Sequence, residues 1–303
     1  MKYLDFREAK SVFKDDRNVM EFLRKKSNED SNTSEIIEIA YDLQAGSYIK
    51  HVTAALEKTK LYADELHSLL TPHLTDGCSI LDVGTGELTT LSLLANKLDD
   101  RVSKIFAFDI SWSRLSKGLG FWNRTVTKQH INLSAFVADI KKIPLAAKSI
   151  DVVTSNHALE PNGKNLASLL SELFRVCKRK CVLFEPSYEH NSREGKKRMD
   201  SLGYIKGLEE TVKVLGGTLI DFELVKNTDN PLNPTACYVI DPPLEEVSEA
   251  LNENKFSVPG TSFPLILNNG FMESAETGLL FPVLNNIPIL KEDSAILASS
   301  LFD

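Results

Sequence analysis

The sequence predicts an α/β protein with a mainly parallel β-sheet that helices cover on both faces. Seven short β-rich segments lie between residues 78 and 240, and helical segments separate most of them. Such alternation is typical of consecutive βαβ units. Only "KNTDNPLNP" separates the last two segments, 218–225 and 235–240. Because this connection is too short for a crossover helix, we expect these strands to form an antiparallel pair at one edge of the sheet.

The first part of the chain, residues 5–73, has a helical pattern. Apolar residues recur at intervals of three and four in "SEIIEIAYDLQAGSYIKHV" and in "AALEKTKLYADELHSLLTPHL". The first of these segments follows "SNTSE", a group of residues that favour the N-terminal cap of a helix. We therefore predict a helical N-terminal extension, residues 1–74, that acts as a lid.

The predicted strands form a central domain, residues 75–241. Their sequences, in chain order, are CSILDV, KIFAFD, INLSAFVA, IDVVTS, KCVLFEP, TLIDFELV and TACYVI. After "DPP" the chain becomes acidic, and its last 63 residues carry a net charge of −8. The pattern there predicts one helix and then short runs that Pro, Asn and Gly interrupt. We therefore predict a small acidic C-terminal domain, residues 242–303.

Composition excludes several classes of protein. The chain has 303 residues, 42% hydrophobic side chains and a net charge of −7. With no long apolar segment and no apolar leader, we expect a cytoplasmic protein that does not cross a membrane. Nucleic acid is not an expected partner, because the short basic runs at 178–180 and 193–198 are interpreted as solvated surface. Four scattered cysteines predict neither a disulfide framework nor a metal site, and the oligomeric state stays open.

The stretch "ILDVGTGELTTL" has the pattern of a strand, a tight turn and a helix. Gly84 and Gly86 let the backbone turn sharply and approach a ligand closely. A dinucleotide-binding turn requires a third glycine at position 89, which is Thr89. Asp82 at the strand end repels a pyrophosphate but suits a cationic ligand, such as the amino acid part of S-adenosylmethionine. A tight turn without a ligand is the alternative.

Two further acids follow the next two predicted strands. Asp109 ends the second strand, where its carboxylate can accept hydrogen bonds from both hydroxyls of a ribose. Asp139 follows the third strand, where it can accept a hydrogen bond from the amino group of adenine. Ile110 and Ile140 supply apolar walls for the purine. Each acid alone would be an ordinary turn residue, but together with Asp82 they predict one nucleoside site.

The residues around these acids resemble the class I S-adenosylmethionine-dependent methyltransferases. The resemblance covers the central domain, in "LDVGTGE", "FDIS", "VADIKKIPLAAKSIDVVTSNHALE" and "LLSELFRVCKRKCVLFEPS". It implies a Rossmann-like, doubly wound sheet of seven strands with an antiparallel last strand, and S-adenosyl-L-methionine as the cofactor. It also implies that Asp82, Gly84 and Gly86 shape the methionine pocket. Asp109 would then hold the ribose, and Asp139 would contact the adenine.

The sequence departs from the family pattern at two places. Leu88 stands where a glycine is common, and this change reshapes the methionine end of the pocket. The run "KRK" replaces the "PGG" turn that usually precedes the fifth strand, which alters only a surface turn.

The segment after the fourth predicted strand, "TSNHALEPNG", faces the transferable methyl group in this family. His157 is the predicted general base, with Asn156 beside the cofactor and Glu160 in contact with the substrate. Glu185 and Tyr188 end the fifth strand on the same rim, so Glu185 is a second predicted catalytic residue and Tyr188 a substrate contact. A structural role for His157 at the entry to a helix is the alternative.

The N-terminal helices supply the predicted lid over this pocket. Tyr41, Gln44 and Tyr48 in "AYDLQAGSY" are spaced to share one helical face. We therefore expect these three side chains to face the substrate together.

The absence of two motifs excludes some classes of methyl acceptor. The fourth strand is not followed by the Asn/Asp-Pro-Pro-aromatic motif of enzymes that methylate amino groups of DNA and glutamine, and no cysteine lies there for carbon-5 pyrimidine methylation. We therefore predict methylation of an oxygen or nitrogen atom in a small molecule, sugar or peptide. The alternatives are an RNA or protein methyltransferase, and a non-catalytic S-adenosylmethionine-binding protein with an interaction or regulatory role. An oxidoreductase that uses nicotinamide conflicts with Thr89 and Asp82.

The C-terminal domain carries a second resemblance. Its "FPVLNNIPIL" ending is similar to small zinc-ribbon activator proteins that partner methyltransferases, in which cysteines hold zinc. No cysteine follows Cys237 in this chain. We therefore expect a metal-free ribbon held together by an apolar hairpin.

Overall fold

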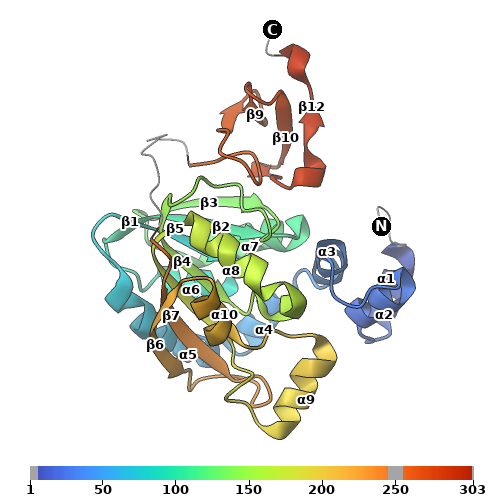
Figure 1. Cartoon of the computed structure of the whole chain (residues 1–303), viewed down its shortest axis with the longest axis vertical. Coiled ribbons are helices and arrows are strands. Elements are labelled where there is room, and N and C mark those ends of the chain that lie inside the picture. Colours follow the sequence, from blue (N-terminus) through green and yellow to red (C-terminus); the bar gives the residue numbers. More distant parts are fainter. Residues whose placement is uncertain (1–5, 245–254, 302–303) are drawn as a thin grey trace.

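The computed structural model describes residues 6–244 and 255–301 (Figure 1). The helix predicted after "DPP" falls mostly on residues outside this described part. The N-terminal region is helical, as predicted, and its helices are α1 (Phe6–Lys14), α2 (Val19–Ser27), α3 (Ser34–Leu43), α4 (Ser47–Ala54) and α5 (Leu56–Leu70). The Thr33 side chain accepts a hydrogen bond from the Ile36 N–H and so caps α3.

The prediction that Tyr41, Gln44 and Tyr48 lie on one helix is wrong, because the chain breaks between α3 and α4. Gly46 adopts φ 99°, a left-handed conformation that no other residue type adopts easily. Gln44 is the C-terminal cap of α3, and α4 starts at Ser47 in a new direction. Tyr41, Gln44 and Tyr48 therefore do not share one helical face.

The central sheet has seven strands, which confirms the predicted fold class. The strands are β1 (Cys78–Val83), β2 (Val102–Asp109), β3 (Asn132–Val137), β4 (Ile150–Asn156), β5 (Cys177–Pro186), β6 (Thr218–Leu224) and β7 (Thr235–Asp241). They pair in the order β3-β2-β1-β4-β5-β7-β6, and β7 runs antiparallel to both of its neighbours. The last two strands thus form the expected antiparallel pair at one edge, with β6 outermost.

Helices cover both faces of this sheet. The helices between strands are α6 (Thr89–Ala95), α7 (Trp112–Thr125), α8 (Leu166–Val176), α9 (Arg193–Leu202) and α10 (Leu208–Val214), with short 3₁₀ turns at Thr71–His73 and Glu160–Asn165. One apolar core joins the sheet to α8 and α10, and the other joins it to α5, α6 and α7. Among the described residues, no helix has the length and apolar character needed to span a membrane.

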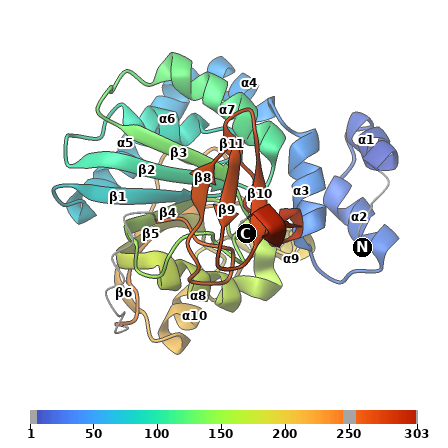
Figure 2. The ribbon, with the colours of Figure 1, turned by 90° about the horizontal axis from the view of Figure 1, so that it is seen from above.

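A small antiparallel sheet forms the C-terminal unit. Its strands are β8 (Ile266–Asn268), β9 (Phe271–Ser274), β10 (Leu279–Leu284), β11 (Ile287–Pro288) and β12 (Ile296–Leu297), and short 3₁₀ turns lie at Glu292–Ser294 and Ser299–Leu301. Figures 1 and 2 show this unit beside β3, near α3. The Leu290 N–H donates to the Val137 carbonyl at 2.8 Å, so the unit covers the free edge of β3.

The C-terminal unit shares a core with the central domain and contacts the N-terminal helices. Phe281 and Leu290 are fully buried in the same apolar cluster as Phe106 and Phe136 of the sheet. Lys291 pairs with Glu38 of α3 at 2.6 Å. The unit therefore packs against both neighbouring regions of the chain.

Candidate functional site

One cavity of about 470 Å³ lies at the carboxyl ends of β1 to β4, beneath the N-terminal helices α3 to α5. Ligands of open α/β sheets bind at this end of the strands. Most predicted site residues line the cavity: Tyr41, Tyr48, Asp82, Gly84, Gly86, Asp109, Ile110, Asp139, Ile140, Asn156, His157 and Glu160. Gln44, Glu185 and Tyr188 do not line it.

The turn after β1 depends on its two glycines. Gly84 and Gly86 adopt φ 62° and 57°, in the left-handed region that favours glycine. A Cβ atom on Gly84 would lie 2.5 Å from the Ala158 Cβ, and one on Gly86 would lie 2.4 Å from the Arg114 guanidinium. The turn therefore accepts no side chain at either position.

Leu88, which stands where the sequence pattern expects a glycine, has a backbone conformation that favours glycine. It adopts φ 55°, the conformation that a glycine at this position would allow without strain. Its side chain is fully buried beneath the sheet face that α6 covers. Burial of the leucine side chain offsets the cost of this backbone conformation.

Asp109 organises the cavity wall at the end of β2. Its Oδ2 accepts the Gly86 N–H at 2.9 Å, and its Oδ1 accepts the Ser111 N–H at 2.9 Å. These bonds fix the carboxylate between the turn after β1 and the start of α7. A carboxylate oxygen has a second lone pair, so each can still accept a ligand hydroxyl.

Arg114 is a site residue that the sequence reasoning missed. It lies 3.6 Å from Asp109, and its guanidinium lies over the rings of Tyr41 (4.7 Å) and Tyr48 (4.9 Å). Its Nε is buried without a hydrogen-bond partner. One signal was available: position 114 shares the buried face of α7 with Gly118, where a charged residue is rare unless it is paired.

Asp82 and Asp139 occupy different environments at the other strand ends. Burial raises the pKa of Asp82 to about 7, and the carboxylate of Asp109 acts in the same direction. Asp82 therefore gains from a nearby cation, which would favour its ionised form. Asp139 accepts the Lys141 N–H at 2.9 Å in a turn, and it lines the cavity together with Ile110 and Ile140.

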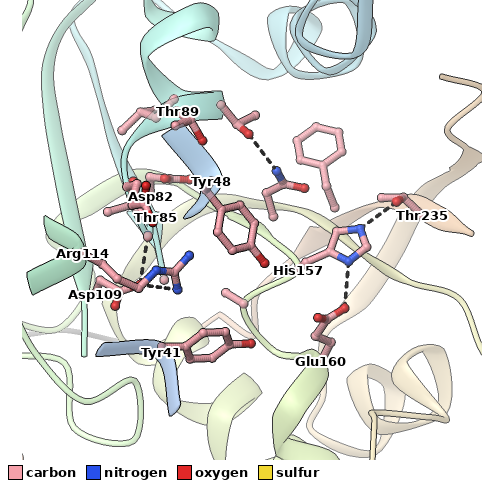
Figure 3. A pocket seen from close by; sticks show the side chains of 18 of the residues that line it. Tyr41, Tyr48, Asp82, Thr85, Thr89, Asp109, Arg114, His157, Glu160 and Thr235 are labelled. Carbon is pink, nitrogen blue, oxygen red and sulfur yellow. Dashed lines mark hydrogen bonds and ion pairs between the residues drawn. The ribbon is translucent and has the colours of Figure 1, made fainter. Parts of the chain in front are cut away.

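His157 sits in a strained turn on the opposite side of the cavity (Figure 3). Its φ of 57° is rare for a residue with a side chain and is typical of functional sites. Nδ1 lies 2.8 Å from Glu160 Oε2, and Nε2 lies 2.7 Å from the Thr235 hydroxyl. Burial alone would lower the pKa of His157, but the carboxylates of Glu160 and Glu185 outweigh it and raise the pKa. His157 and Glu160 thus form an acid–base pair.

Glu185 lies beneath the loop that carries His157. It is fully buried, and its Oε1 accepts the N–H groups of Ala158 (3.0 Å) and Leu159 (3.1 Å). Burial raises the pKa of Glu185 to about 7. Glu185 therefore supports this loop from beneath and does not line the cavity.

Two other predicted substrate contacts lie away from the cavity wall. Tyr188 donates a hydrogen bond to Asp200 at 3.1 Å, next to Lys196 and Lys206. Gln44 ends α3 at the break before α4. By contrast, Figure 3 shows Tyr41 and Tyr48 beside Arg114, with Tyr48 between Arg114 and His157.

Asn156 and Glu87 connect the cavity to the N-terminal helices. Asn156 Oδ1 accepts the Tyr62 hydroxyl of α5 at 2.7 Å. Glu87 is almost fully buried and accepts the N–H groups of Gly46 (2.8 Å) and Ile49 (2.9 Å) at the start of α4. The predicted lid is therefore hydrogen-bonded to the turn after β1 and to the end of β4.

Comparison with known proteins identifies the central part of the chain. Residues 74–215 match a family model described as a methyltransferase domain. This match supports a methyltransferase enzyme, and the sheet order and the cavity at the strand ends agree with it. No curated protein sequence gives a significant match.

Several solved structures are similar to part of the chain. A chain from the complex between the Haloferax volcanii Trm112 methyltransferase activator and a methyltransferase is 18% identical, with a TM-score of 0.52 over 67% of this chain and 98% of that chain. A methyltransferase from Methanosarcina mazei is 16% identical, with a TM-score of 0.49 over 58% of this chain and 97% of that chain. A methyltransferase from Bacillus halodurans is 16% identical, with a TM-score of 0.47 over 59% and 99%.

Proposed function

We propose that this domain transfers the methyl group of S-adenosylmethionine to an oxygen or nitrogen atom of a small-molecule, sugar or peptide acceptor. The observation that carries the proposal is the arrangement of three acids around one cavity. Asp82 lies near the end of β1, Asp109 ends β2 and Asp139 follows β3, and all three line the cavity wall. This set suits a ligand with an ammonium group, a ribose and an adenine.

The residues present fit this cofactor. The turn at Gly84 and Gly86 leaves no room for side chains, so a ligand can approach its backbone closely. Asp109 is held by two N–H groups and keeps lone pairs for ribose hydroxyls. Ile110 and Ile140 line the same end as Asp139, where an adenine ring would pack.

When bound, this cofactor supplies a sulfonium methyl group, which bonds to the acceptor lone pair as the carbon–sulfur bond breaks and its electron pair stays on sulfur. The protein contributes by holding the acceptor in line with the methyl group. We propose that Nε2 of His157, when the ring is neutral, takes the proton that the acceptor loses, after the acceptor displaces the Thr235 hydroxyl from Nε2. Glu160 orients the imidazole through Nδ1, and Glu185 holds the loop that carries it.

The test is calorimetric titration of S-adenosylhomocysteine, the demethylated product, into the protein and its Asp109→Ala variant. Loss of the ribose contacts should weaken binding by about 1.5–3 kcal/mol, the usual contribution of hydrogen bonds to a charged group. Asp100→Ala is the control, because Asp100 is 96% exposed and lies before β2, away from the cavity. Unchanged affinity in Asp109→Ala would place the ligand elsewhere.

We also propose that the C-terminal unit is a ribbon-like appendage that folds without zinc. The sequence has no cysteine after Cys237, and no histidine after His190. Within residues 6–244 and 255–301, no group of three His, Cys, Asp or Glu side chains could hold a metal ion. Elemental analysis of protein washed with chelator should find no stoichiometric zinc. One zinc per chain would contradict the proposal.

A further inference from the structure

Two polar atoms at the His157 end of the cavity are buried without a hydrogen-bond partner. They are Nη1 of Arg198, on α9, and Oδ1 of Asn233, in the loop between β6 and β7. Both residues line the cavity; Asn233 lies beside His157 and Glu160, and Arg198 lies over the Tyr204 ring. A buried donor or acceptor without a partner lowers stability, so a ligand that supplies the partner gains affinity.

The neighbouring groups fix which atoms remain available. Asn233 Nδ2 lies 3.2 Å from Glu160 Oε2, and the carboxylate can only accept, so the amide nitrogen must face it. The amide oxygen of Asn233 is therefore the atom left without a partner. Glu160 Oε2 also accepts from His157, at 2.8 Å. The site thus lacks a partner for one cationic donor and for one neutral acceptor.

Arg198 brings a positive charge to the cavity wall. The segment "REGKKR", interpreted from the sequence as solvated surface, forms most of α9, and its last residue, Arg198, reaches the cavity. The Arg198 guanidinium lies 5.6 Å from the centre of the Tyr204 ring. Burial raises the pKa of Tyr204, with Glu160 adding to this effect and Arg198 opposing it, so both charges act on one ring. A dianion would be repelled by Glu160, whereas a single carboxylate matches the arginine.

We propose that the methyl acceptor is a small organic acid that also carries a hydroxyl or amino group. Its carboxylate pairs with Arg198, and its hydroxyl or amino group donates to Asn233 Oδ1. The methyl group goes to that oxygen or nitrogen, and the electron pair of the broken carbon–sulfur bond stays on sulfur. A hydroxyl turns its single proton from Asn233 Oδ1 to Nε2 of neutral His157, in place of the Thr235 hydroxyl, and loses it there, whereas an amino group loses a second proton to Nε2. This assignment rests on the proposed function, because it names the acceptor of the methyl transfer.

The test compares acids with their amides. Three pairs are titrated calorimetrically into protein saturated with S-adenosylhomocysteine: 4-hydroxybenzoate and 4-hydroxybenzamide, lactate and lactamide, and alanine and alaninamide. At least one acid should bind about 10- to 100-fold more tightly than its amide, as expected for a charge-assisted hydrogen bond. Arg198→Gln should remove this preference. Lys197→Gln should keep the preference for the acid. This variant removes the same charge from the same helix, but at an exposed position.

The outcomes separate this inference from the proposed function. S-adenosylhomocysteine binding by each variant also shows that the variant is folded. If S-adenosylhomocysteine binds and no acid binds more tightly than its amide, the acceptor assignment fails and the methyltransferase function stands. A preference that survives in Arg198→Gln also overturns the assignment, as does tighter binding of 4-hydroxyphenyl phosphate than of 4-hydroxybenzoate. If S-adenosylhomocysteine does not bind the wild-type protein, both proposals fail.

Discussion

His157 combines a strained backbone conformation with hydrogen bonds at both ring nitrogens. The sequence placed it after the fourth strand, where a base would be expected, because strand ends can be recognised from local patterns. Its contact with Thr235 could not be predicted. That contact depends on β7 lying next to β5 in the sheet, and such long-range order is not encoded in either segment alone.

The titration of His157 follows from its pair with Glu160. A raised pKa keeps the imidazole protonated at pH values where an ordinary histidine, with pKa 6.5, is already neutral. Only the neutral ring accepts a proton, so any base-assisted rate should rise with pH through this raised pKa. Glu160→Gln removes the carboxylate charge and should lower the pKa of His157. NMR titration of the His157 ring measures it directly.

Glu194→Gln is the matched control for this titration. Glu194 is exposed on α9 and has no contact with His157, so the same loss of charge there should leave the pKa unchanged. Equal pKa values in the wild-type protein and in Glu160→Gln would show that the pair does not control the titration.

The raised pKa of Glu185 should make the folded protein less stable as the pH rises. Its pKa of about 7 in the folded protein exceeds the ordinary value of 4.5. Below pH 4.5 both states are protonated, and as pH rises to 7 the unfolded state loses its proton first. Stability is thus lost over this range, by about 3 kcal/mol once the pH exceeds 7. Asp82, also with a pKa of about 7, adds a similar loss.

Glu185→Gln should remove one of these two losses. The amide oxygen of glutamine can still accept the N–H groups of Ala158 and Leu159, so the loop keeps its support. We expect urea denaturation to show the variant more stable than the wild-type protein at pH 8, and little different at pH 4.5. A stability difference that is the same at both pH values would contradict the raised pKa. Glu210→Gln, at an exposed position on α10, is the control.

At the scale of elements, the link between the lid and the turn after β1 is the feature that sequence patterns could not supply. The periodicity of residues 34–52 correctly indicated helix but not the break at Gly46, since an isolated glycine is tolerated within helical patterns. Glu87 follows Gly86 directly, yet its hydrogen bonds go to residues about 40 positions earlier. A buried glutamate beside the glycine turn was visible only in the structure.

Glu87→Ala should loosen α4 without unfolding the central sheet. The variant removes the acceptor of the Gly46 and Ile49 N–H groups, and hydrogen bonds to a charged group contribute about 1.5–3 kcal/mol. Amide hydrogen exchange in α4 should become about 10- to 100-fold faster, while β1 and β4 keep their protection. Glu57→Ala, at a position 85% exposed on α5, should leave exchange in α4 unchanged. Unaltered protection of α4 in Glu87→Ala would show that other contacts hold the helix.

At the scale of the whole molecule, local patterns predicted the seven strands and the antiparallel edge pair but not the position of the C-terminal unit. Alternating strands and helices carry their own signal, because each βαβ unit is formed by neighbouring segments. The contact between Leu290 and Val137 joins residues more than 150 positions apart. The sequence of a short apolar segment does not indicate which other segment it packs against. The uneven charge of the C-terminal residues marked a boundary, whereas the shared apolar core crosses it.

The shared core predicts that the central domain and the C-terminal unit unfold together. Leu290 is fully buried in the core that includes Phe106 and Phe136 of the sheet, so Leu290→Ala should lower the free energy of unfolding by about 2–5 kcal/mol. Both tryptophans of the chain lie on α7, outside the C-terminal unit, so their fluorescence reports the central domain. In urea, fluorescence and circular dichroism should shift together to the same lower midpoint, as for one cooperative unit. Leu297→Ala, at a position 74% exposed, should leave both midpoints in place. An unchanged fluorescence midpoint in Leu290→Ala, with an early loss of part of the dichroism signal, would instead show a C-terminal unit that unfolds by itself.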